Sequence, residues 1–240
     1  MKQASVCLTP EQGKKLIAKA IAVLPDVVET VRKGTCVVIT GTTNRYVAEE
    51  LLKLIGEDAS LPGFFRGVTV PRGVKAEAAD PVEDVVIVKG KRVRGKTVFD
   101  VAPGMGKDDL IFKGANAVNL ETGEAAVLVG NPALGTSLPL LQASYGRRVP
   151  VIIPVGVEKR VPAPIRMLAE QVRDPDTAGL HMLPLPGEVF TELDALETLY
   201  DLEAEIIASG GVMGAEGAVY FLVSGEDEDV DRFIKDAGTL

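Results

Sequence analysis

The stretch CVVITGTTNRYVAEELL, residues 36–52, begins as a strand and ends as an amphipathic helix. Its β-branched run, residues 37–39, stops at the small polar turn Thr-Gly-Thr-Thr-Asn, residues 40–44. Apolar residues then recur at the three- and four-residue spacing of a helix. A strand that passes through a short turn into a helix is the building unit of a parallel sheet covered by helices.

Similar units follow along the chain, so we predict an α/β fold with a Rossmann-like, mostly parallel sheet and helices on both faces. Buried strands are expected at 109–114, 125–130 and 149–156, with helices after 135–137 and 162–164. The predicted domain spans residues 1–180. Its core is formed by 30–60 and 109–156, and 60–105 is a β-rich excursion with short strands at 63–71 and 84–101.

The last quarter of the chain has a different pattern, from which we predict a small α+β subdomain over residues 181–240. A strand at 181–186 precedes a long helix from Thr191, with Tyr200, Ala204 and Ile207 on one face. A strand at 218–224 and an acidic helix complete the subdomain.

Composition limits the classes of function. The chain has 240 residues, 46% of them hydrophobic, and a formal net charge of −8, which argues against a general nucleic-acid binder. The N-terminus lacks the apolar core of a signal peptide, and no apolar run approaches the roughly 20 residues of a membrane helix. We therefore expect a cytoplasmic protein. With two cysteines and one histidine, no metal site and no cofactor are expected.

The turn at residues 40–44 is the first candidate site. Amides at a helix N-terminus lack intrahelical partners, and the helix dipole favours negative charge there. A glycine lets an anion approach the backbone, and hydroxyls add donors. We expect phosphate binding by Thr40, Gly41, Thr42, Thr43 and Asn44. The alternative is that Asn44 is only the helix N-cap.

The segment DLIFKGANAVNLETG, residues 109–123, supplies the second group of candidates. Lys113 could neutralise a phosphate, Gly114 and Ala115 leave space, and Asn116 could bind hydroxyl groups. Glu121 could serve as a general acid/base or a nucleophile. The same residues also fit a plain hairpin with a glycine turn.

Two further candidates come from other strand ends. Gly135 and Thr136 open a helix and could bind the ligand, and Lys159 follows a buried strand. The basic segment 89–96 either protects an exposed sheet edge or forms a lip over an anionic ligand.

The turn 40–44 and the strand of residues 109–116 together resemble the superfamily of ribose-5-phosphate isomerase, glucosamine-6-phosphate deaminase, sugar-sensing repressor domains and CoA transferases. The resemblance covers about residues 35–160 and implies a phosphate loop at 40–44. Asn116 and Lys113 stand where the sugar isomerases usually have aspartates. Glu121 resembles the glutamate of the CoA-transferase turn, which forms an acyl intermediate.

The predicted function is binding of a phosphorylated, sugar phosphate-like small metabolite, with isomerase- or transferase-type acid–base chemistry by Glu121, Lys113 and Lys159. One alternative is a non-catalytic metabolite sensor or assembly protein on the same fold. Another is a CoA-dependent acyl transferase or hydrolase that uses Glu121, with CoA as a substrate. No nucleic acid or membrane is expected as a partner. A homodimer is expected by analogy with the superfamily.

Overall fold

A six-stranded mixed sheet forms the centre of the computed structural model, which describes residues 1–70 and 83–240. Four strands are mutually parallel, and two more extend the sheet as an antiparallel hairpin. The spatial order is β10 (Glu188–Phe190), β8 (Val151–Pro154), β5 (Leu110–Phe112), β2 (Thr35–Val38), β3 (Val85–Val88) and β4 (Lys91–Val93). The fold is therefore mixed α/β.

Helices cover both faces of this sheet because its strands are apolar on both sides. Cys36 and Val38 of β2 face one buried cluster, and Val37 and the following Ile39 face another. The first cluster is shared with α1 (Pro10–Ile21), α2 (Pro25–Lys33) and α3 (Thr42–Leu54). The second is shared with α4 (Val98–Val101), the 3-10 turn η1 (Ala102–Gly104), α5 (Ser137–Leu141) and the π-helical turn η2 (Gln142–Gly146).

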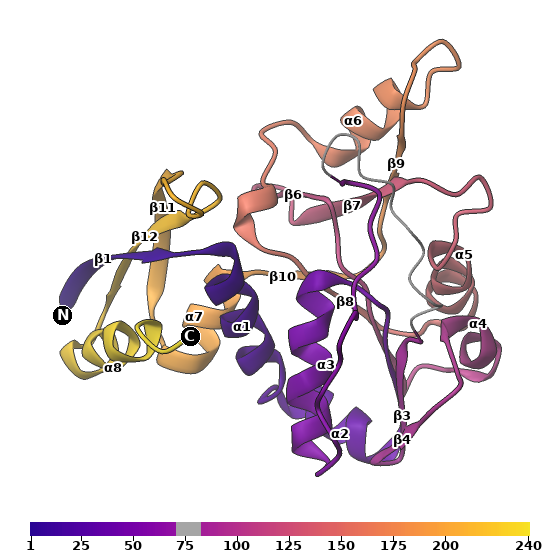
Figure 1. Cartoon of the computed structure of the whole chain (residues 1–240), viewed down its shortest axis with the longest axis horizontal. Coiled ribbons are helices and arrows are strands. Elements are labelled where there is room, and N and C mark those ends of the chain that lie inside the picture. The colour runs from indigo at the N-terminus through magenta and orange to yellow at the C-terminus, as the bar shows by residue number, and fades with distance from the viewer. Residues whose placement is uncertain (71–82) are drawn as a thin grey trace.

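Two three-stranded antiparallel sheets flank the centre (Figure 1). One joins β1 (Lys2–Leu8), β12 (Val219–Gly225) and β11 (Glu203–Ser209), and it lies with α8 (Asp227–Ala237) at the end of the molecule that holds both termini. The other joins β6 (Ala117–Asn119), β7 (Glu124–Val129) and β9 (His181–Pro184) beside α6 (Ile165–Val172). The 3-10 turn η3 (Val157–Lys159) follows β8 of the central sheet. The helix α7 (Glu192–Tyr200) leads from β10 of the central sheet to β11 of the C-terminal sheet.

The predicted boundary at residue 180 is crossed by three strand pairings. β9 pairs with β7 and β10 with β8, so residues 181–190 complete sheets that begin earlier in the chain. β1 pairs with β12, so the first residues complete the C-terminal sheet. β1 was not predicted from the sequence, although its positions alternate between partly buried and exposed.

Three local predictions are wrong. No strand forms over residues 63–70 of the predicted strand 63–71, and Pro71 lies outside the described residues. The end of the segment 84–101 is the helix α4 rather than a strand, because Thr97 and Asp100 form a capping box.

The third error concerns the helix from Thr191, which ends at Tyr200. Asp201 takes a left-handed conformation with φ 55°, and the chain turns into β11, which contains Ala204 and Ile207. The capping box between Thr191 and Asp194 at the start of this helix is present as predicted.

Glu192 joins three elements in the interior. Its Oε2 accepts a hydrogen bond from the Val157 amide at 2.8 Å, and a Cβ atom on Gly13 of α1 would lie 2.3 Å from its Oε1. Burial raises the pKa of Glu192 to about 7. Because its ordinary pKa is 4.5, the protonated form stabilises the fold at low pH, and this stabilisation is lost as the pH rises from 4.5 through 7.

We predict that Glu192→Gln removes this pH dependence. The free energy of unfolding of the native protein, relative to the variant, should fall between pH 4.5 and 7.5 by at most about 3 kcal/mol. Urea unfolding at several pH values measures the difference. Glu197→Gln, on the exposed side of the same helix, is the matched control. A difference for Glu192→Gln that stays constant with pH would contradict the assignment.

Candidate functional site

A pocket of about 460 Å³ lies at the edge of the sheet where β2 and β5 end. We call it the central pocket. It gathers segments that are far apart in the sequence, because the carboxyl ends of parallel strands meet at one edge. Its lining comprises residues 40–43, 66–68, 113–116, 127–131 and 134–137, together with Phe99 and Lys159.

The turn at residues 40–44 forms one wall. The helix α3 begins at Thr42 with Gly41 as its N-cap, so the prediction that Asn44 could be the N-cap is wrong. The first amides of this helix have no intrahelical partners. The Thr43 hydroxyl oxygen is buried and has no hydrogen-bond partner among the described residues. A buried polar atom of this kind requires a partner, which a ligand in the pocket can supply.

Asn44 does not line the pocket but holds the turn in place from behind. Its side chain is buried, and its Nδ2 donates hydrogen bonds to the carbonyl oxygens of Ile39 at 2.7 Å and Phe112 at 3.2 Å. These two carbonyls lie at the ends of β2 and β5. Asn44 therefore joins the two strands directly below the helix N-terminus.

Asp84 supports the same turn from the other side and was not among the predicted site residues. This residue is only 4% exposed. Oδ1 accepts hydrogen bonds from the Thr40 amide at 2.9 Å and the Thr40 hydroxyl at 3.0 Å, and Oδ2 accepts one from the Val98 amide at 2.9 Å. The only signal in the sequence is an acidic residue directly before a buried apolar strand.

Lys113 and Lys159 extend from different strand ends into the central pocket. The Lys113 Nζ donates to the Thr136 hydroxyl oxygen at 3.0 Å, and the Lys159 Nζ donates to the Ala115 carbonyl at 2.9 Å. Burial lowers the pKa of both ammonium groups, that of Lys113 to about 8. Thr136 occupies the N-cap position of α5. Its hydroxyl oxygen accepts the hydrogen bond from Lys113 and does not cap the helix.

The remaining predicted residues of this pocket shape it. A Cβ atom on Gly114 would meet nothing nearer than the Asn44 Oδ1 at 3.9 Å, so this part of the wall is open. Asn116 is less available than predicted, because its Oδ1 accepts a hydrogen bond from the Leu128 amide at 3.0 Å. Gly135 has φ 52° at the turn into α5.

The charge of the central pocket is one-sided. Arg66, Lys113 and Lys159 line it, and no Asp or Glu does so among the residues that the structure describes. This lining contrasts with the net charge of −8 on the whole chain. Arg66 was not a candidate in the sequence analysis, because its segment resembles a strand.

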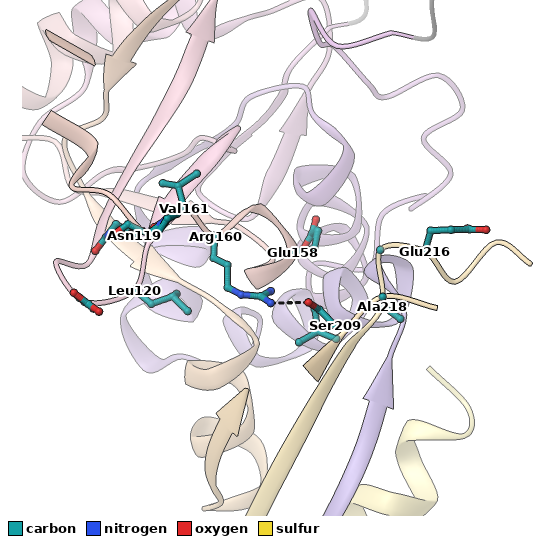
Figure 2. Close-up of a pocket in the computed structure, with 13 residues that line it drawn as sticks. Asn119, Leu120, Glu158, Arg160, Val161, Ser209, Glu216 and Ala218 are labelled. Atoms are coloured by element: carbon teal, nitrogen blue, oxygen red, sulfur yellow. Dashed lines mark hydrogen bonds between the residues drawn. The ribbon is translucent and has the colours of Figure 1, made fainter. Parts of the chain in front are cut away.

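Glu121 lies elsewhere. It is an exposed residue in the turn of the hairpin β6–β7, as the simpler prediction for this segment requires. It lines a second pocket of about 580 Å³, here called the hairpin pocket, between this turn and the loop from β11 to β12. Figure 2 shows the hairpin pocket, where the Arg160 Nη2 donates to the Ser209 hydroxyl at 2.7 Å. The structure thus separates Glu121 from the other predicted site residues.

The basic segment 89–96 also lies outside the central pocket. It contains the turn from β3 to β4, and β4 is the last strand of the six-stranded sheet. None of its cations lines the central pocket. The position agrees with protection of a sheet edge, and the lip over the ligand is not supported.

No protein-family model, curated protein or solved structure matches the chain at a significant level. Within residues 1–70 and 83–240, no helix is both long enough and apolar enough to cross a membrane.

We predict that Asp84→Asn destabilises the protein by about 2 kcal/mol, because an amide nitrogen would face a backbone donor that now has a carboxylate acceptor. Chemical denaturation of the purified variant measures the change. Asp108→Asn, at a carboxylate that is 83% exposed, should have almost no effect. Equal stability of the two variants would show that Asp84 does not support the turn.

Proposed function

We propose that the central pocket binds a phosphorylated small metabolite and that the protein acts on it. The observation that carries this proposal is the concentration of positive charge and hydrogen-bond donors in the pocket. Three cations, a helix N-terminus and the unpartnered hydroxyl of Thr43 converge there, and no carboxylate among the described residues lines the pocket. Positive charge and free helix amides favour an anion there.

The phosphate is assigned to the start of α3. There the amides of residues 42–44 can donate to its oxygens, and the Thr43 hydroxyl can donate one more hydrogen bond. Gly41 permits close approach, since an added Cβ atom would meet only ordinary contacts at 3.8 Å and 3.9 Å. The rest of the metabolite would then extend toward Lys113 and Lys159.

Lys113 is the group best suited to acid–base chemistry in this pocket. A pKa of about 8 leaves both protonation states populated near neutral pH. The separation of Glu121 from the pocket supports lysine rather than glutamate as the acid or base, and it offers no support for an acyl-transfer reaction there. Isomerase- or transferase-type chemistry, the Rossmann-like arrangement and the homodimer are parts of this proposal.

A non-catalytic sensor is the second candidate, and the absence of a carboxylate from the described lining favours it. It requires the same phosphate binding but no turnover. Incubating the protein with the metabolite that binds and following its conversion by NMR distinguishes the two.

Thermal unfolding with a panel of ligands tests the binding. The panel comprises inorganic phosphate, pentose and hexose phosphates, nucleotides and CoA. A ligand at 100 times its dissociation constant should stabilise the protein by about 2.7 kcal/mol. Gly41→Val should abolish the effect while costing at most about 1 kcal/mol of stability without ligand. No stabilisation by any phosphate compound would refute the proposal.

We further predict that Thr43→Val separates binding from stability. Without ligand the variant should be as stable as the native protein or more stable by about 1 kcal/mol, because an unpartnered buried hydroxyl is removed. The dissociation constant for the phosphate compound should rise about tenfold or more, since a hydrogen bond to a charged group is lost. Calorimetric titration and thermal unfolding measure the two effects.

Thr30→Val on α2 is the control, because Thr30 does not line the central pocket. Unchanged affinity in Thr43→Val would place the phosphate away from the start of α3.

A further inference from the structure

We propose that Lys113 forms an imine with a carbonyl group of the ligand, which makes the substrate class a phosphorylated aldehyde or ketone. This inference rests on the proposed function, since the phosphate would hold the carbonyl group in the central pocket. It adds to that function the reacting atom of the protein, the Lys113 Nζ, and the functional group that it attacks.

The first support is the position of Lys113. It directly follows β5, an inner strand of the sheet, so rigid structure holds its backbone. The next residues are Gly114 and Ala115, and the space beside Gly114 is open to 3.9 Å. Lys113 lines the central pocket, whose volume of about 460 Å³ has room for a small carbonyl compound.

The second support is the set of partners around the amine. Among the described residues, the structure gives the Lys113 Nζ one hydrogen bond, to the Thr136 hydroxyl, and no ion pair. Asp84 is the acidic group that acts on its charge, but the carboxylate oxygens of Asp84 already accept three hydrogen bonds. The charged form of Lys113 is thus only weakly stabilised.

The protonation of Lys113 agrees with this geometry. Burial is the main cause that lowers its pKa to about 8, and the positive charge of Arg66 contributes, while Asp84 opposes the change. At pH 7.5 the neutral fraction of this amine is on the order of a hundredfold larger than that of an exposed lysine. Only the neutral amine is a nucleophile.

The reaction balances without another reagent. The Lys113 nitrogen lone pair attacks the carbonyl carbon, and the electron pair of the C=O bond moves to the oxygen, which takes a proton. The nitrogen loses a proton, and the carbinolamine then expels the oxygen as water. The net change is one ammonium group and one carbonyl group converted to one protonated imine and one water molecule. The Thr136 hydroxyl, in contact with the nitrogen, is placed to pass a proton.

Borohydride trapping tests the proposal on the native protein. The protein is incubated at pH 7.5 with glyceraldehyde 3-phosphate or with dihydroxyacetone phosphate, reduced with borohydride, digested and analysed by mass spectrometry. We expect a reduced adduct on Lys113, in large excess over any other lysine. Glyceraldehyde without phosphate should label Lys113 at least about tenfold less, because the phosphate contacts are missing.

Two variants complete the test. Lys113→Arg keeps the positive charge and should lose the adduct, and inorganic phosphate should still stabilise it against heat. Lys107→Arg is the control, because Lys107 is 80% exposed and outside the central pocket, and its Lys113 adduct should be unchanged. Adduct mapping on the native protein decides the question even if Lys113→Arg does not fold.

The outcomes separate the two proposals. If inorganic phosphate stabilises the protein but no Lys113 adduct forms, the imine proposal is overturned and the phosphate site remains. The same holds if the labelling of lysines only follows their exposure. An adduct on Lys159 in place of Lys113 also overturns it. A Lys113 adduct without any stabilisation by phosphate supports the imine and overturns the phosphate site.

Discussion

The amide of Asn44 determines the geometry on which the central pocket depends. Two strands end side by side here, and the Phe112 carbonyl already accepts a hydrogen bond from the Ile39 amide at 3.0 Å. From the first turn of α3, the Asn44 Nδ2 donates a second hydrogen bond to the Phe112 carbonyl and one to the Ile39 carbonyl. A single side chain thus fixes the helix N-terminus over the ends of β2 and β5. Asp84 completes the arrangement by holding Thr40 in place.

Local pattern predicted much of the sheet and of the site. The strand–turn–helix of residues 36–52, the buried strand ending at Lys113 and the strand before Lys159 are all present, because apolar periodicity reflects burial directly. The turns after the strands 36–40, 109–114 and 149–155 were expected at one edge of the sheet. Residues 40–43, residues 113–116 and Lys159 line one pocket there.

What the sequence could not show depends on contacts between distant segments. Asp84 was missed because its role depends on the position of Thr40, which no local pattern encodes. Glu121 was grouped with the site because it follows a site strand closely, but the hairpin β6–β7 turns it toward another pocket. The helix after Thr191 was extended too far, since Ala204 and Ile207 fit helical spacing, whereas in β11 Ala204 pairs with Val223 and Ile207 lies at the register shift between Ile206 and Ala208.

The pairing of β1 with β12 joins segments more than two hundred positions apart. During synthesis, residues 2–8 leave the ribosome long before residues 219–225 exist. The backbone groups of β1 therefore stay unpaired until β12 has been made. Closing so long a loop is slow, because its entropy is lost before the contacts form. All six strands of the central sheet precede β12 in the chain, so this sheet can assemble earlier. The last part of the molecule to become native should therefore contain its first residues.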